Sequence, residues 1–275
     1  MARPLLATIA AIALAAPFSV SSAMATTITI DNFTEAQTVI AAQQGNPASS
    51  TITGAESNLI GGVRFMQVQT TNTQPPPDAT QVGTIFNAEA GNLGFANDPT
   101  SIGTGWLVYD GTEDRGGLAS PATVAGLSFG ASVNPSGLNA DLLLGQPTGF
   151  FTFTADNFDQ LQPNALTFSA FAWDMLGNTV GYYEEIDPLN FSPILSYNAF
   201  RSDWNDPNSG LGGFDWGQVG ALAFRVDSTE QAFDGQITGI TATPIPLPAS
   251  ALLLLGGLGG LAGWSFSAKR RRNKS

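Results

Sequence analysis

The stretch Ala221-Leu222-Ala223-Phe224-Arg225-Val226 alternates large apolar residues with small or charged ones. Successive side chains of a β-strand point to opposite faces, so this period of two predicts a strand with Leu222, Phe224 and Val226 on one face. Residues 27–30, 63–69 and 151–154 repeat the pattern. In the second of these runs one face carries Val63, Phe65, Gln67 and Gln69.

Turn-forming residues separate these runs, and no stretch between the two ends of the chain sustains a helical period. The clearest turns are Gly61-Gly62, Pro75-Pro76-Pro77, Asn97-Asp98-Pro99, Gly116-Gly117, Asn134-Pro135, Gly177-Asn178 and Asn208-Ser209-Gly210. Many short strands joined by such turns predict an antiparallel β-sandwich or jelly roll over residues 26–243. A β-helix is the alternative, but the sequence has no regular repeat of the kind a solenoid needs.

The charges are distributed unevenly along the chain. All 22 acidic residues lie between Asp31 and Asp234, where the only basic residues are four arginines, giving that part a net charge of −18. Nucleic acid and anionic lipid are therefore improbable partners, and metal cations or basic surfaces fit better. High acidity is equally explained by solubility in a salty medium.

The chain contains neither cysteine nor histidine. This excludes disulfides, Ser-His-Asp and Cys-His catalysis and ordinary zinc sites. The acidic part also lacks lysine, which excludes Schiff-base chemistry there. What remains is carboxylate chemistry and metal binding through oxygen ligands, and stability has to come from a large apolar core.

The first 25 residues have the features of a secretory signal peptide. Arg3 precedes an apolar run over residues 5–16, and Ala23-Met24-Ala25 is a small-x-small cleavage site for signal peptidase. We therefore expect residues 1–25 to be removed and the mature protein to begin at Thr26.

The last part of the chain, residues 244–275, has the features of a membrane anchor. Residues 249–266 carry no charge and would reach about 27 Å as a helix, close to the thickness of a bilayer's hydrocarbon core. The basic cluster behind them, from Lys269 to Lys274, is expected to stay in the cytoplasm and to leave the preceding domain outside.

Together with that cluster, Ile245-Pro246-Leu247-Pro248-Ala249 resembles the VPLPA-CTERM variant of the bacterial PEP-CTERM sorting signals, with Ile245 in place of the family's valine. The resemblance implies recognition by an exosortase-type enzyme and cleavage near Pro246 to Ala249. The protein would then be anchored in the inner membrane first and reach the cell surface or the extracellular space after processing. An ordinary single-pass anchor is the alternative.

Four short motifs also resemble the jelly-roll ectodomains of many PEP-CTERM proteins, which are similar to carbohydrate-binding modules. They are Asp31-Asn32-Phe33, Ile60-Gly61-Gly62-Val63-Arg64, Val108-Tyr109-Asp110-Gly111 and Phe233-Asp234-Gly235-Gln236-Ile237. We use them as an indication of fold alone.

A sugar site needs a flat aromatic face beside carboxylates, amides or arginine. The loop over residues 201–208 fits this requirement best, and Trp216 lies near another loop. We expect ligand-binding residues among Arg201, Asp203, Trp204, Asn205 and Trp216. Trp173, which follows an apolar strand, is expected in the core.

Oxygen-rich loops could hold a structural Ca²⁺. The clearest ligands are Asp110, Glu113 and Asp114, and residues 156–159 and 203–208 are further loops of this kind. Local turns in which the aspartate caps its own backbone explain each loop equally well. Apart from this Ca²⁺, no cofactor is expected.

A glycosidase would need two carboxylates across a cleft, and the conspicuous acidic cluster is Glu184-Glu185 with Asp187. Adjacent strand residues point to opposite faces, so Glu184 and Glu185 do not form such a pair. We therefore expect an exported, non-catalytic β-sandwich of the cell surface or extracellular matrix that binds exopolysaccharide. An adhesive protein acting through protein contacts is the first alternative, and a carboxylate-based glycoside-active enzyme is the less favoured second.

Overall fold

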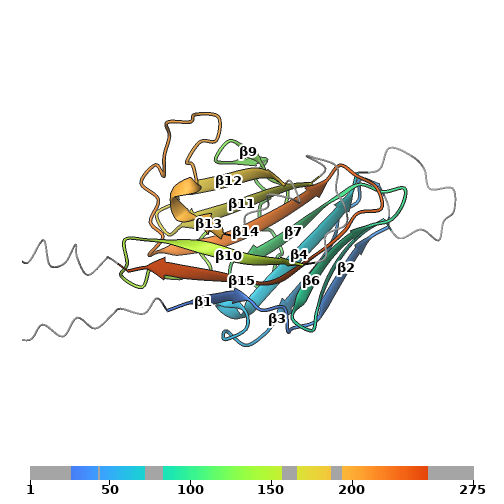
Figure 1. Cartoon of the computed structure of the whole chain (residues 1–275), viewed down its shortest axis with the longest axis horizontal. Coiled ribbons are helices and arrows are strands. Elements are labelled where there is room, and N and C mark those ends of the chain that lie inside the picture. The colour runs from blue at the N-terminus through green and yellow to red at the C-terminus, as the bar shows by residue number, and fades with distance from the viewer. Residues whose placement is uncertain (1–25, 43, 72–82, 157–165, 187–193, 247–275) are drawn as a thin grey trace, which may run out of the picture. The chain divides into compact units, whose positions relative to one another are not determined.

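The computed structural model describes residues 26–42, 44–71, 83–156, 166–186 and 194–246. They form two antiparallel β-sheets that share one apolar core (Figure 1), which confirms the all-β prediction and is consistent with a β-sandwich. Helical structure in these ranges is limited to two 3-10 turns, η1 (Ile60–Gly62) and η2 (Tyr197–Ala199). No helix there is long and apolar enough to cross a membrane. The predicted signal peptide with Ala23 and Ala25, and the predicted tail from Leu247 onward with Pro248, Ala249 and the membrane segment, lie outside the described residues.

Sheet A contains seven strands in the order β13-β10-β15-β6-β5-β2, with β1 as an additional partner of β15. β10 pairs along almost all of β15, whereas β6 and β1 share the other side of β15, one after the other. The strands are β1 (Ile28–Asp31), β2 (Gln37–Ala41), β5 (Thr84–Glu89), β6 (Asn92–Asn97), β10 (Thr148–Asp156), β13 (Ile194–Ser196) and β15 (Asp234–Ile245).

Sheet B contains six strands in the order β12-β11-β14-β7-β4-β3. They are β3 (Ala48–Thr53), β4 (Val63–Thr70), β7 (Gly103–Tyr109), β11 (Leu166–Asp174), β12 (Thr179–Ile186) and β14 (Val219–Ser228). A small hairpin of β8 (Thr123–Val124) and β9 (Leu127–Ser128) packs with its flanking loops on the outer face of this sheet.

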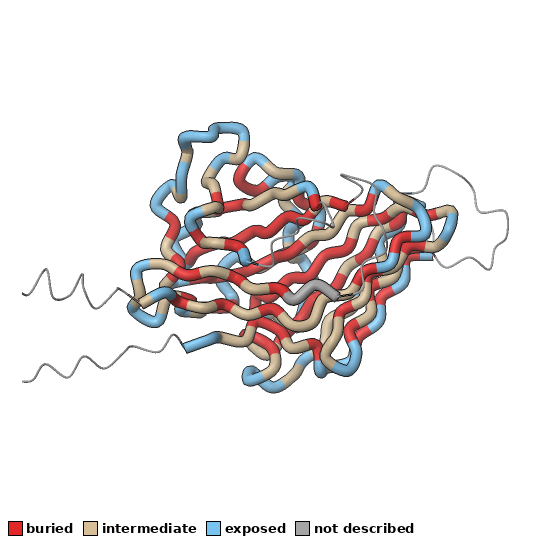
Figure 2. Tube along the Cα trace, viewed as in Figure 1, coloured by how far each residue is buried: buried red, intermediate tan, exposed pale blue. Residues whose placement is uncertain are grey.

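Apolar residues are buried on both faces of sheet B, which explains the composition of its central strand β14. Leu222 and Phe224 point into the core between the sheets, where Phe224 meets four rings from three other strands. Ala221 and Ala223 point outward and are buried under the β8–β9 segment in a second, smaller core. Figure 2 shows the resulting concentration of buried positions along the strands.

A buried ion pair links the two sheets. Arg64 on β4 and Asp31 on β1 are 0% and 1% exposed, and Arg64 Nη1 donates to both carboxylate oxygens of Asp31 at 3.1 and 2.8 Å. Tyr109 on β7 donates to Asp31 as well, at 2.9 Å, while Arg64 Nε donates to the amide oxygen of Gln37 on β2 at 2.8 Å. Burial raises the pKa of Tyr109 well above 10, and the Asp31 charge raises it further, so the phenol remains a donor.

The two ends of the described domain lie side by side in sheet A. β1 and β15 are antiparallel, with Ile28 opposite Ala242, and β15 continues to Ile245, opposite Thr148. The last strand therefore runs past the predicted domain boundary at residue 243, and the described residues between 26 and 246 belong to one compact unit. Ile245, the first residue of the predicted sorting signature, belongs to the sheet.

Replacing Arg64 by methionine should destabilise the fold strongly. Arg64→Met leaves the Asp31 carboxylate buried without its cation, which typically costs about 3–5 kcal/mol. Urea unfolding should show this loss as a lower midpoint. Arg201→Met is the matched control, because Arg201 is only half-buried and donates to backbone carbonyls, a loss of about 1 kcal/mol. Equal losses in the two variants would contradict the role given to the pair.

Candidate functional site

The outer face of sheet B is polar where the β8–β9 segment does not cover it. Strand pairing aligns residues of five strands, β4, β7, β14, β11 and β12, into rows across this face. One row contains Gln67, Trp106, Arg225, Ser169 and Tyr183. The next contains Gln69, Thr104, Asp227, Thr167 and Glu185. The sequence placed Gln67 and Gln69 on one face of the 63–69 run. The structure aligns them with residues of four further strands.

Arg225 and Asp227 form the centre of this polar face. Arg225 Nε lies 2.6 Å from Asp227 Oδ2, and Arg225 Nη1 donates to the carbonyl of Ser128 on β9 at 2.9 Å. The guanidinium lies over the Trp106 ring, 5.0 Å from its centroid. Thr104 donates to Asp227 Oδ1 at 2.5 Å. Because both side chains are held from several directions, they present fixed polar atoms to the solvent.

A groove of about 410 Å³ runs over this centre. Thr104, Thr167, Ser169, Arg225 and Asp227 belong to its floor strands, and its other lining residues are Thr71, Ile102, Leu127, Ser128, Tyr183, Ser228 and Thr229. This volume lies within the range of ligand sites, about 300–1,000 Å³. The groove combines hydroxyls, one carboxylate, one guanidinium and one tyrosine ring.

Three of the predicted ligand-binding residues come together beside this groove. Trp204 N donates to the carbonyl of Ala125 in the β8–β9 turn at 2.7 Å, and the Asn205 amide lies 3.4 Å from the Gly126 carbonyl. The Trp204 ring is partly exposed and its centroid lies 6.4 Å from that of Tyr183, which lines the groove. Asp203 accepts from Asn205 N and shapes the loop.

The prediction that Trp216 binds a ligand was wrong. In the structure, Arg201 holds the loop after η2. Trp216 is 4% exposed and stacks on Tyr197 in the main core, with ring centroids 4.2 Å apart, so its face is not available to a ligand. Arg201 Nη1 donates to the carbonyls of Asn198, Ala199 and Phe200, which anchors the loop after η2. Trp173 is in the second core, as expected.

The loop that carries the predicted calcium ligands Asp110, Glu113 and Asp114 is closed by an ion pair. Asp110 is fully buried, and its two oxygens accept from Arg115 Nη2 and Nη1 at 2.8 and 2.9 Å. Asn134 N also donates to Asp110, while Asp114 caps Gly116 N in an exposed turn and Glu113 lies exposed beside it. Among the described residues no three carboxylates gather into a group that could hold a metal ion.

Glu184 and Glu185 point to opposite faces of β12, as predicted. Tyr182 donates to Glu184 at 2.8 Å, and Tyr183 lies 3.4 Å from Glu185 on the other face. Burial raises the pKa of Tyr182, and the hydrogen bond to Glu184 raises it further. Asp187 lies outside the described residues.

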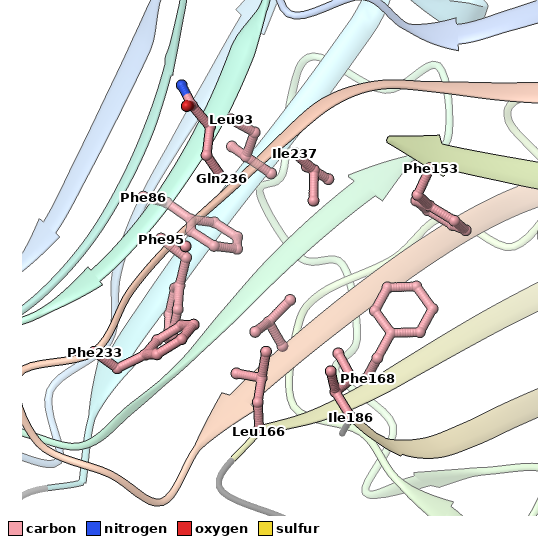
Figure 3. Close-up of a pocket in the computed structure, with 12 residues that line it drawn as sticks. Phe86, Leu93, Phe95, Phe153, Leu166, Phe168, Ile186, Phe233, Gln236 and Ile237 are labelled. Atoms are coloured by element: carbon pink, nitrogen blue, oxygen red, sulfur yellow. The ribbon is translucent and has the colours of Figure 1, made fainter. Parts of the chain in front are cut away.

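An apolar cavity between the sheets is too small to be a binding site. Figure 3 shows its lining of aromatic and aliphatic side chains, with Phe86, Phe95 and Phe233 at one end and Phe153 and Phe168 at the other. Its volume is about 40 Å³. That is about a tenth of the groove's volume on the same measure and far below the roughly 300 Å³ at which ligand sites begin.

No protein-family model matches the chain, and a search of curated protein sequences finds no match.

Arg115→Met should unfold at a clearly lower urea concentration than the wild type. The substitution leaves Asp110 buried without its cation, a loss of about 3 kcal/mol. Because the ion pair occupies the carboxylate, adding Ca²⁺ or EDTA should leave the wild-type midpoint unchanged. A midpoint that rises with Ca²⁺ and falls with EDTA would restore the metal interpretation of this loop.

Asp174 should contribute stability that depends on pH. Burial opposes its ionisation, but hydrogen bonds from Asn178, Asp215 N and Leu176 N outweigh this and lower the pKa of Asp174 below its usual 3.8. A lowered folded-state pKa stabilises the fold above pH 3.8, and this contribution is lost as the pH falls through the folded value.

Asp174→Asn should therefore lower the urea midpoint at pH 7 and approach the wild type at pH 3. Asp215→Asn, on a half-exposed loop residue, is the control. A difference between Asp174→Asn and wild type that is the same at both pH values would show that charge is not involved.

Proposed function

We propose that this chain is an exported, non-catalytic protein of the cell surface or extracellular matrix that binds a neutral glycan in the groove on sheet B. Residues 1–25 would direct export, and the Ile245 to Ala249 signature with the apolar and basic residues behind it would anchor the protein until an exosortase-type enzyme processes it. The sequence features of both chain ends support this delivery route.

A jelly-roll type of sandwich fits the order of the strands. After β1 and β2 in sheet A, the chain passes to sheet B with β3 and β4 and then changes sheet repeatedly up to β15. Because the strands of each sheet are contributed from all along the chain, a groove on one sheet can draw on distant segments. This supports the resemblance to carbohydrate-binding ectodomains without assigning a ligand.

The single observation that carries the glycan proposal is the groove itself. Sugar recognition requires an aromatic face for C–H groups and fixed hydrogen-bonding groups for the hydroxyls. Tyr183 supplies the ring at one side, and Arg225, Asp227, Thr104 and Thr167 supply polar atoms on the floor. The partly exposed Trp204 ring adds aromatic surface next to Tyr183.

The charges favour a neutral glycan over an acidic one. Asp227 neutralises Arg225 within the groove, and Glu185 lies exposed in the same row of the sheet. The whole part from Asp31 to Asp234 has a net charge of −18, which repels polyanions. We therefore expect neutral polysaccharide to bind better than uronic acid polymers, most clearly at low salt.

Binding is favoured over glycoside hydrolysis by the state of the carboxylates. Asp227 is the one acidic residue that lines the groove in the part the structure describes, and it is paired with Arg225. Glu185, two strands away on β12, is not among the residues that line the groove. The described lining therefore lacks the pair of carboxylates that glycoside hydrolysis requires.

Affinity electrophoresis through neutral and acidic polysaccharides tests the proposal. Wild-type protein should be retarded by a neutral polysaccharide, and Tyr183→Ala should weaken this by roughly fivefold, since ring stacking contributes about 1 kcal/mol. Asp227→Asn should weaken it as well. Glu89→Gln, on the exposed β5–β6 turn of sheet A, is the matched control and should bind as the wild type does.

The other outcomes separate the alternatives. Absence of retardation on every polysaccharide would refute the glycan proposal, and loss of cell aggregation on deletion would then favour an adhesive protein acting through protein contacts. If the wild-type protein releases reducing sugar and Glu185→Gln abolishes this release, the protein is a glycoside-active enzyme and not a binding protein.

A further inference from the structure

One end of the sandwich exposes apolar side chains. Among the described residues, six large hydrophobic side chains are exposed, and four of them are Leu144, Met175, Leu176 and Ile245, at 46, 38, 72 and 40%. We call these four residues the apolar end surface.

Hydrogen bonds place the four residues at the same end. Leu142 N donates to the carbonyl of Trp216 and Met175 N to that of Gln218, so the loop before β10 and the β11–β12 turn flank the same short segment. Ile245 pairs with Thr148, a few residues after Leu144. Figure 1 shows that β15 ends where β10 begins, whereas β14 connects to β15 at the opposite end.

The backbone conformation around Leu144 and Leu176 is fixed by local hydrogen bonds. Leu144 has a φ of +48°, a left-handed conformation that is strained for a leucine, and it is kept by two hydrogen bonds from Leu143 N and Leu144 N to Asp141. Leu176 N is likewise held by Asp174, in a turn completed by Gly177 at φ +88°. Two separately organised turns therefore each hold a leucine exposed at this end of the sandwich.

The position of the chain end identifies what this surface faces. β15 ends at Ile245, and the predicted membrane segment begins at residue 249. A fully extended chain covers about 3.5 Å per residue, so this end of the sandwich stays within roughly 14 Å of that segment. The loops that carry Leu144 and Leu176 are at the same end of the sheets as Ile245.

We propose that the apolar end surface rests on the lipid bilayer while the tail is still attached. This inference depends on the proposed membrane anchor. Residues 142–147 and 175–178 contain no lysine or arginine, so the contact would be hydrophobic, independent of anionic lipid and insensitive to salt. It would hold the domain in one orientation and leave the far end, with the β14–β15 connection, directed away from the membrane.

The absence of cysteine allows a direct test with the full chain. Leu144→Cys, Leu176→Cys and, at the far end, the exposed control Gln231→Cys are each labelled with an environment-sensitive fluorophore and reconstituted into phosphatidylcholine vesicles. Nitroxide-bearing lipid should quench most of the fluorescence at positions 144 and 176 and little at 231, at low and high salt alike.

Flotation of the same samples separates the two proposals. A chain that floats with the vesicles but shows equal quenching at 144, 176 and 231 overturns the bilayer contact and leaves the anchor intact. Labels at 144 and 176 that are shielded from water but not quenched by the lipid also overturn it, because a protein segment then covers the surface. A chain that does not float overturns the anchor and the contact together.

Discussion

The buried pair of Asp31 and Arg64 is the constraint on which the arrangement of the sheets depends. Arg64 is fully buried in sheet B, and its hydrogen bonds reach β1, β2 and the carbonyl of Glu35, all at the side of sheet A. An arginine without these partners would be very costly to bury. The hydrogen bonds of Arg64 form only when β1 lies beside β15 and β2 lies opposite β4. This one cation therefore determines where the first two strands pack.

Sheet B serves two purposes because its strands are buried unequally along their length. Its inner face contributes to the core between the sheets, while part of its outer face is sealed by the β8–β9 segment through Phe129, Trp106 and Trp173. Arg115, stacked on Phe65 and paired with Asp110, holds that segment down. The groove begins at the edge of the β8–β9 segment. There this segment packs against Trp106, and Arg225 lies over the Trp106 ring.

Much of the fold followed from period-two alternation in the sequence, and the site followed only in part. The strands over 221–226 and 63–69 were predicted correctly, with Gln67 and Gln69 on one face of the second, because alternation is a local property. Which strands are neighbours is not local, so the row that joins Gln67 to Tyr183 through Arg225 could not be predicted. The burial of Trp216 and the ion pair of Asp110 could not be predicted for the same reason: their partners, Tyr197 and Arg115, lie at a distance or carry no signal in the sequence until the fold brings them together.

The position of β15 has a mechanical consequence. This strand leads to the chain end and is bonded on one side to β10 and on the other to β6 and β1. Hydrogen bonds of an antiparallel pair lie across the strands, so tension applied along β15 loads many of them at once instead of one after another. A load entering at Ile245 is therefore shared by the middle of sheet A.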